Sequence, residues 1–393
     1  MIGISRLYCG TVEASDSLRY RAAAGGARRK PVVVWNCTRR CNLRCAHCYS
    51  QSLDVPDDAE LSTDEGKALL DDLAAFKCPA VLFSGGEPLL RPDLPALIAH
   101  ARANGLRAVL STNGTRITPA LAEQFRHIGL SYVGVSLDGI GATNDAFRGL
   151  DGAFQAALAG IRCCIAAGMK VGLRLTLTRH NVTDLDAIFA LIRDENIPRA
   201  CFYHLVLTGR GAELAAASLS HDETRRAVDR IIDWTARLHA AGQPREILTV
   251  DNHADGPYLY LRMLRQHSPR AAEVLRLLEI NQGSGSGSGI GCVSWDGSVH
   301  PDQFWRSATL GNVREGSFSG IWSNPRDPLL AALRDKAHHV TGRCASCRFL
   351  NICGGNLRAR AQAIAGDPWA SDPGCYLSDQ EIAPDHTRDT GGP

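Results

Sequence analysis

The chain has 393 residues, of which 45% are hydrophobic, and its formal net charge is +2. This length is sufficient for two domains with a sizeable core, and the near-zero charge gives no reason to expect nucleic acid as the main partner. No apolar run is long enough to cross a bilayer and the first residues lack the apolar core of a signal peptide, so we expect a cytoplasmic protein without a membrane partner.

The first 48 residues lead to a compact group of cysteines. Residues 1–30, with an Ala/Gly-rich run at 21–29, predict a loosely ordered lead-in that has a short strand or helix near its start. The apolar, β-branched run at 31–35 predicts a buried strand. Directly after it stand Cys41, Cys45 and Cys48, separated by three and two residues.

Strand and helix patterns alternate up to residue 240. Apolar runs predict further strands at 80–83, 106–111, 132–137, 170–177 and 199–207. Amphipathic patterns and caps predict helices at 62–76, 92–103, 119–127, 152–167, 183–193 and 221–240. Six βα units in series imply parallel strands with helices outside. Six are too few for a closed eight-stranded barrel, so we expect an α/β fold with an open sheet.

Polar and glycine motifs follow several of these strands. Ser84-Gly85-Gly86-Glu87-Pro88 follows the second strand, and similar segments begin at Ser111 and Ser136 after the next two. Parallel α/β barrels carry their active sites at the carboxyl ends of the strands. The pattern therefore predicts a site on this rim.

Beyond residue 240 the alternation stops. The sequence predicts one more strand at 246–250, a helix at 269–280, a β-hairpin at 293–300 and short helices at 328–336 and 354–364. The Gly/Ser-rich stretch 281–289 has the composition of a flexible linker, although a natural glycine-rich loop beside a site fits it as well.

Three cysteines this close would repel one another as thiolates unless a cation holds them. Sulfur ligands favour zinc, copper(I) or iron–sulfur clusters. A structural zinc loop is one alternative, with Cys37 or His47 as the fourth ligand of a tetrahedral site. The other is a cubic 4Fe–4S cluster that leaves one iron open to a further ligand.

The Cys-x3-Cys-x2-Cys loop resembles the signature of the radical S-adenosylmethionine (SAM) superfamily. The resemblance implies that Cys41, Cys45 and Cys48 hold a catalytic 4Fe–4S cluster whose fourth iron binds SAM. It implies cleavage of SAM to a 5′-deoxyadenosyl radical, which takes a hydrogen atom from the substrate. It also implies a partial (β/α)6 barrel, in agreement with the alternation of strands and helices.

The same resemblance assigns residues to SAM, namely Gly85, Gly86, Glu87, Asn113, Ser136 and Arg174. In the Gly-Gly-Glu-Pro motif, glycine lets the backbone approach the methionine moiety, and Glu87 offers a carboxylate to the SAM ammonium. Ser136 is the candidate for the ribose, and Arg174 for the carboxylate, because arginine pairs well with a buried carboxylate. Asn113 is expected near the adenosine and His47 near the adenine. The loop 144–149 matches one often seen in the family and is assigned a mostly structural role.

A second group of cysteines resembles the C-terminal SPASM domain of radical SAM proteins, with ligands at Cys344, Cys347, Cys353 and Cys375. The resemblance implies an auxiliary 4Fe–4S cluster in a small α+β domain, and a four-cysteine zinc site is the alternative. Leu357 and Asp302 stand where the family has further cysteines, so we expect no other auxiliary cluster there. We expect a lead-in at 1–30, the barrel at 31–240, a helical bridge at 241–280 and the cluster domain at 281–393.

Segments 202–211 and 297–305 resemble the tetrapyrrole-modifying branch, and nearly the whole chain resembles the radical SAM proteins of heme d1 biosynthesis. This implies an enzyme that removes propionate-derived side chains on rings A and B of 12,18-didecarboxysiroheme, with flavodoxin or ferredoxin as reductant. The alternatives are a heme synthase that decarboxylates iron-coproporphyrin, a SPASM-type peptide-maturing enzyme, and a non-enzymatic zinc or scaffold protein. Candidate macrocycle contacts are Arg39, Arg40, Arg210, Trp305 and Arg306, with His204 or His300 as candidate ligands of the substrate iron.

Overall fold

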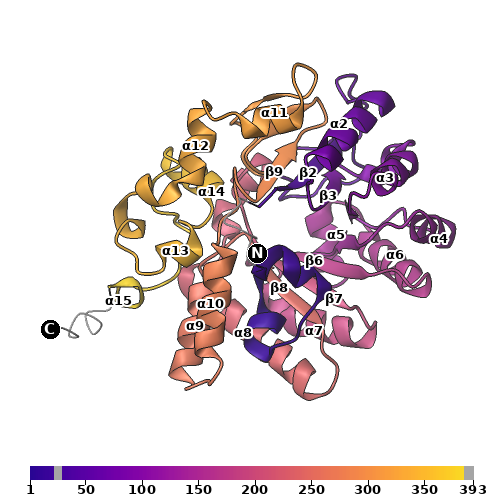
Figure 1. The fold of residues 1–393 in the computed structure, drawn as a ribbon. Coiled ribbons are helices and arrows are strands. Elements are labelled where there is room, and N and C mark those ends of the chain that lie inside the picture. The colour runs from indigo at the N-terminus through magenta and orange to yellow at the C-terminus, as the bar shows by residue number, and fades with distance from the viewer. Residues whose placement is uncertain (22–28, 385–393) are drawn as a thin grey trace.

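The computed structural model describes residues 1–21 and 29–384. Its strands form one sheet in the order β1-β8-β7-β6-β5-β4-β3-β2-β9-β10-β11, which is open within the described residues. Strands β2 to β8 lie side by side in parallel and form a curved wall (Figure 1). They are β2 (Val32–Thr38), β3 (Val81–Gly85), β4 (Ala108–Thr112), β5 (Val133–Ser136), β6 (Val171–Leu177), β7 (Arg199–His204) and β8 (Glu246–Val250).

The predicted alternation is confirmed, and the seventh parallel strand is the one predicted at 246–250. Helices cover the outside of the wall: α2 (Thr63–Ala75), α3 (Leu94–Ala103), α4 (Pro119–His127), α6 (Ala153–Ala166), α7 (Leu185–Asp194) and α8 (His221–Ala240) (Figure 1). Six of the seven residues of β2 are buried, as expected of a strand covered on both faces. None of the helices in the described part of the chain is both long and apolar enough to span a membrane.

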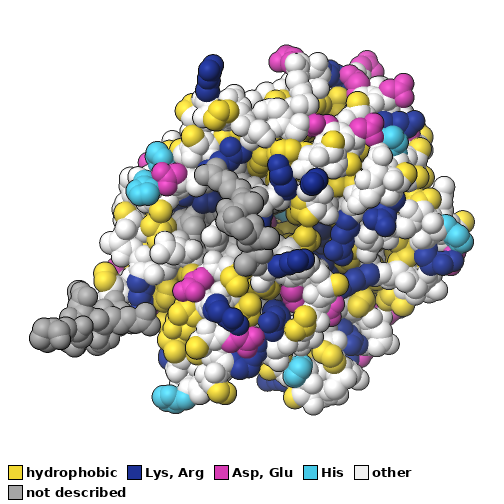
Figure 2. Space-filling model, in the orientation of Figure 1, with side chains coloured by type: hydrophobic (Ala, Val, Ile, Leu, Met, Phe, Trp, Pro, Cys, Tyr) yellow, Lys and Arg dark blue, Asp and Glu magenta, His cyan; other side chains and the backbone are white. Residues whose placement is uncertain are grey.

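The short strand or helix predicted near the start of the lead-in is confirmed, whereas residues 1–20 as a whole are more ordered than predicted. Strand β1 (Ile2–Gly3) pairs antiparallel with β8, and the short helix α1 (Ser17–Tyr20) follows in front of the sheet (Figure 1). Buried Glu246 accepts hydrogen bonds from Ser15 and Arg19. Although burial opposes its charge, Arg199 and Lys170 lower the pKa of Glu246 to about 2. Figure 2 shows the molecule from the same side as Figure 1, and Lys and Arg side chains surround a depression near the centre of this face. Most of the Ala/Gly-rich run, 22–28, lies outside the described residues.

The C-terminal part begins inside the same sheet. Strand β9 (Ile290–Val293) pairs in parallel with β2, and the predicted hairpin is confirmed by β10 (Ser298–His300), followed by β11 (Gly311–Asn312). The sequence missed helix α9 (Asp255–Arg265), which precedes the predicted α10 (Ala271–Asn281). The remaining helices are α5 (Ala142–Arg148), α11 (Phe318–Ser323), α12 (Pro328–Arg334), α13 (Leu350–Cys353), α14 (Arg358–Ala365) and α15 (Asp379–Ile382).

The Gly/Ser-rich stretch 281–289 packs tightly and does not act as a flexible linker. Ser284 and Ser286 are buried, and the Ser286 hydroxyl donates to Asp302. Gly283 has a φ of +65°, and a β-carbon there would lie 2.0 Å from the carbonyl oxygen of Cys353. Glycine is therefore required where this loop crosses one of the C-terminal cysteines.

Candidate active site

The cysteine loop leaves the end of β2 and is held by residues distant in sequence. Arg210 donates from Nε to the carbonyl of Cys45 at 2.9 Å and from its backbone amide to that of Cys48 at 3.0 Å. Arg306 donates to the carbonyl of Ser50 at 3.1 Å. Two of the arginines expected to contact a macrocycle therefore hold the loop.

The three thiols of this loop interact electrostatically with one another. Burial, and then the charges of Cys45 and Cys48, raise the pKa of Cys41 to about 12. Burial likewise raises the pKa of Cys45, whereas for Cys48 burial is outweighed by hydrogen bonds, chiefly with Ser50, that lower the pKa of its thiol. A bound cluster would stabilise all three thiolates. Among the described residues, no three His, Cys, Asp or Glu side chains are arranged around a single ion position.

A buried ion pair lies beneath the cysteine loop. Arg148, at the end of α5, pairs through Nη2 with Asp138, and its Nη1 donates to Cys45 Sγ at 3.5 Å. His47 stacks on Phe147 with ring centroids 4.7 Å apart. Burial, opposed in part by Asp138, lowers the pKa of His47 to about 4, so its ring is neutral. The sequence assigned segment 144–149 a mostly structural role, yet Arg148 contacts a cysteine sulfur directly.

The Gly-Gly-Glu-Pro motif packs against the start of the cysteine loop. A β-carbon on Gly85 would lie 2.3 Å from the Thr38 carbonyl oxygen, and one on Gly86 would lie 2.1 Å from that of Arg40. The Gly86 amide donates to Thr38 at 2.8 Å. The two glycines thus let the Gly-Gly-Glu-Pro loop touch the backbone of the segment that leads into the cysteine loop. The sequence suggested instead that they let the backbone approach the methionine moiety of SAM.

Replacing Gly86 with alanine is expected to displace the cysteine loop, because the added methyl group overlaps the Arg40 backbone. Overpacking of this kind costs about 1–3 kcal/mol. We expect a lower thermal midpoint and less iron per chain after anaerobic reconstitution. Gly316→Ala is the matched control, since nothing lies within 4 Å of its β-carbon position. Equal iron loading in the two variants would contradict the role given to Gly86.

Glu87 and Asn113 join neighbouring loops. Glu87 is fully buried and accepts hydrogen bonds from the Thr112 hydroxyl at 2.6 Å and from the Asn113 and Leu89 amides at 2.7 and 3.1 Å. Asn113 donates to Asn42, within the cysteine loop, at 2.9 Å. Both carboxylate oxygens of Glu87 accept hydrogen bonds, so this residue links neighbouring loops of the rim. The assignment of Glu87 and Asn113 to SAM stays a proposal.

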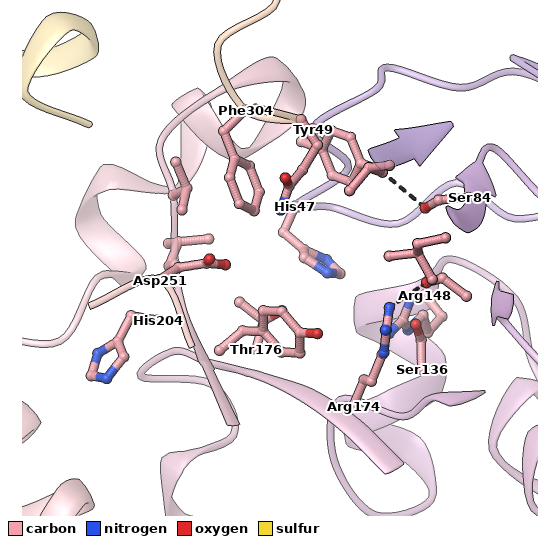
Figure 3. Close-up of a pocket in the computed structure, with 17 residues that line it drawn as sticks. His47, Tyr49, Ser84, Ser136, Arg148, Arg174, Thr176, His204, Asp251 and Phe304 are labelled. Atoms are coloured by element: carbon pink, nitrogen blue, oxygen red, sulfur yellow. Dashed lines mark hydrogen bonds between the residues drawn. The ribbon is translucent and has the colours of Figure 1, made fainter. Parts of the chain in front are cut away.

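A cavity with about 750 Å³ of empty space opens beside the cysteine loop at the carboxyl ends of the strands. Ser136 and Arg174 line it, as do His47, Tyr49 and Ser84 (Figure 3). Arg174 Nη1 donates to Ser111 at 2.6 Å, while its Nε is buried and has no hydrogen-bond partner. This orphaned donor suits an anionic ligand. Gly134 provides the space, since a β-carbon there would lie 2.3 Å from Arg174 Nε.

Several residues of the cavity were not predicted from the sequence. Tyr49 donates to Asn36 at 2.9 Å and Phe304 packs on its ring. Asp251 and Gln303 enter from the C-terminal part of the chain. Asp251 directly follows β8, so its position at a strand end is a signal that could have identified it.

The two histidines considered for the substrate iron differ. His300 has both ring nitrogens occupied, by Ser294 at 3.0 Å and the Ala308 carbonyl at 2.9 Å. His204 pairs through Nε2 with Asp255 at 2.9 Å and lines the cavity. His300 is therefore excluded on its contacts, and His204 is the remaining candidate.

The structure brings together the C-terminal thiols of Cys344, Cys347, Cys353 and Cys375. Burial, and then the charges of the other three thiols, raise the pKa of Cys353. Arg343 donates to the Cys375 carbonyl at 3.4 Å. Two positions at which the sequence lacks the family's cysteines have other roles. Leu357 packs in an apolar cluster. Asp302 accepts hydrogen bonds from the backbone amides of Phe304 and Trp305. All four cysteines are half-buried, and their assignment as ligands of a cluster remains a proposal.

Comparison with protein-family models and relatives places these features in a known context. Residues 35–192 match the radical SAM superfamily model, and residues 287–348 match SPASM, an iron–sulfur cluster-binding domain. Fe-coproporphyrin III synthase of Methanosarcina barkeri is 56% identical over 97% of this chain and 99% of its own. Pre-heme d1 synthase of Dinoroseobacter shibae is 46% identical over 90% and 87%.

Solved structures share the fold. Streptococcus suis SuiB bound to precursor peptide SuiA has a TM-score of 0.71 at 17% identity and covers 89% of this chain and 76% of its own. Native anSMEcpe with bound AdoMet has a TM-score of 0.68 at 17% identity and covers 90% and 95%. The two matched models include Cys41, Cys45 and Cys48 and, of the C-terminal group, Cys344 and Cys347. The chain therefore belongs to the radical SAM superfamily and carries a C-terminal SPASM domain, so its cofactors are 4Fe–4S clusters and SAM.

Proposed function

We propose that this protein is a radical SAM enzyme of heme biosynthesis that forms iron-coproporphyrin III from an iron tetrapyrrole. The observation that carries the proposal is the 56% identity to Fe-coproporphyrin III synthase along almost the entire chain. The AdoMet-dependent heme synthase of the same organism is only 32% identical. The second candidate function is pre-heme d1 synthesis, which the sequence alone favoured. It is supported by the 46% identity to the pre-heme d1 synthase of Dinoroseobacter shibae.

A second cavity, which is open to solvent, adjoins the first and shares His204 and Leu205 with it. We place the substrate in this joined recess. The walls of the second cavity include Leu207, Leu219 and Ile364, while Arg360 and His221 supply polar groups. Ser218, Ser220, Thr224 and Asn252 also line this cavity, so its walls mix apolar and polar side chains. Apolar walls suit the faces of a flat macrocycle, and polar groups suit the carboxylates at its edge.

When bound, the catalytic cluster and SAM supply a carbon radical that removes a hydrogen atom from an unactivated C–H bond. We assign Cys41, Cys45 and Cys48 to the cluster, and Arg174 and Ser136 to SAM. Arg148 and Arg210 hold the cysteine loop in place. A protein such as flavodoxin or ferredoxin is the proposed reductant.

Mass spectrometry of the product tests the proposal. Coproporphyrin keeps its propionates, whereas a pre-heme d1 synthase removes those of rings A and B. The reconstituted enzyme, given 12,18-didecarboxysiroheme, SAM and a reductant, is expected to yield iron-coproporphyrin III. A product without two propionates would favour the heme d1 route, and conversion of iron-coproporphyrin itself would favour a heme synthase.

A further inference from the structure

Asp251 has an unusual backbone conformation at the end of β8. Its φ is +67°, a region that side-chain-bearing residues rarely adopt and that tends to mark functional sites. Neighbouring contacts hold it there: Arg360 Nη1 donates to the Asp251 carbonyl at 3.0 Å, and Asn252 donates to the Gly374 carbonyl at 2.7 Å. The Asn356 side chain accepts the His253 amide at 2.6 Å.

These contacts come from the loops that carry two of the C-terminal cysteines. Gly374 precedes Cys375, and Asn356 lies three residues after Cys353. Tyr376, on the other side of Cys375, donates to Asp255 at 2.6 Å. The segment 251–255 is thus fastened to the C-terminal cluster site at one side and borders the active-site cavity at the other.

The Asp251 side chain lacks a partner although it is buried. It is 8% exposed, and its Oδ2 atom has no hydrogen-bond partner. Figure 3 shows the carboxyl group directed into the cavity, between Phe304 and Thr176. A buried polar atom that points into a cavity without a partner is explained most simply by a ligand that satisfies it.

The charged and titratable groups around Asp251 are the Met1 amino group, Arg360, Asp302 and His204. Burial, which outweighs the cations Met1 and Arg360, raises the pKa of Asp251 to about 7. Near neutral pH its carboxyl group therefore carries a proton about half of the time, and in that form it is a hydrogen-bond donor.

We propose that the protonated carboxyl group of Asp251 donates a hydrogen bond to a side-chain carboxylate of the iron tetrapyrrole and so selects its position in the cavity. This inference rests on the proposed function. A carboxylate substrate can bind a neutral carboxyl group but is repelled by an ionised one. The carboxylate of SAM presents the same chemistry, and the test separates the two ligands.

The experiment measures the Kd of iron-coproporphyrin III for the cluster-loaded protein between pH 6 and pH 8, from the visible absorption of the macrocycle. Because the protonated fraction of Asp251 falls as the pH rises through 7, the wild-type Kd is expected to increase about tenfold. In Asp251→Asn the amide donates at every pH, so the Kd should stay near the wild-type pH 6 value throughout. The Met1 amino group, a charged neighbour of Asp251, titrates in the wild type and in Asp251→Asn alike, so it does not account for a difference between them.

Asp251→Gly is the second variant, since glycine accepts the positive φ and the fold does not depend on the carboxyl group. It should bind weakly at every pH, as the wild type does at pH 8. Asp194→Asn is the control: this exposed carboxyl group on α7 pairs with Arg193 and lines neither cavity, so the variant should keep the wild-type pH dependence.

A pH-dependent Kd that persists in Asp251→Asn and Asp251→Gly would overturn the inference. A SAM affinity that loses its pH dependence in these variants, with the tetrapyrrole unaffected, would also overturn it. Both results leave the proposed function intact. Failure of the wild type to bind any tetrapyrrole would instead refute the proposed function.

Discussion

Replacing Cys41, Cys45 and Cys48 together with alanine is expected to abolish formation of 5′-deoxyadenosine from SAM. The three thiols lie on one loop and interact electrostatically, and the triple variant removes every cysteine of that loop. The C-terminal thiols form a separate set around Cys353. The variant should therefore retain about half of the wild-type iron, because a cluster is lost only when its own ligands are removed.

Iron and sulfide analysis after anaerobic reconstitution, with chromatography of the nucleoside product, checks both parts of this expectation. Cys163→Ala is the control, because this half-buried cysteine lies on α6, among the outer helices. Its iron content and SAM cleavage should equal those of the wild type. Complete loss of iron from the triple variant would contradict two independent cluster sites, and residual 5′-deoxyadenosine would contradict the assignment of the loop.

Replacing Arg148 with methionine is expected to destabilise the protein by about 3–5 kcal/mol, the range for a buried ion pair that loses one partner. Arg148 is 7% exposed and Asp138 is fully buried, so the remaining carboxylate has no access to water. His47, the other neighbour, is neutral because its pKa is near 4. Anaerobic urea unfolding of the cluster-loaded protein measures the loss as a shift of the midpoint.

A double variant separates the charge effect from packing. Adding Asp138→Asn to Arg148→Met removes the unpaired charge while its amide oxygen can still accept the Thr176 backbone amide, so we expect part of the stability to return. Arg162→Met, which breaks an exposed pair with Glu195, should lower the midpoint far less, because exposed ion pairs contribute little to stability. If Arg148→Met costs no more than Arg162→Met, the buried pair does not support the loop.

The sequence predicted the features that depend on local pattern. The six βα units, the capping box that begins α2 at Ser62, and the hairpin around Asp296 and Gly297 all appear as expected. Short apolar runs and turn residues determine these elements within a few positions of the chain. The open barrel followed from the number of strands, and the same order of strands is seen in the sheet.

Contacts between distant segments could not be predicted in this way. Glu87 has the residue type expected for binding an ammonium group, yet its oxygens accept hydrogen bonds from Thr112 and Asn113, 25 and 26 residues away. Residues 1–20 lack a strong pattern, but β1 pairs with β8, some 245 residues later, and so becomes ordered. In the sequence, Asp251 is distinguished only by its position after the predicted strand 246–250; its φ and its unsatisfied oxygen appear only in the structure.

The position of β9 limits how the C-terminal domain could be exchanged between members of the superfamily. Because β9 supplies the parallel neighbour of β2, the first strand of the matched C-terminal domain completes the barrel wall of the N-terminal part. An excised barrel would expose the edge of this largely buried strand, and edges of that kind invite association with other chains. Exchange of auxiliary domains between members of the superfamily should therefore succeed only when the donor fragment brings its own version of this strand.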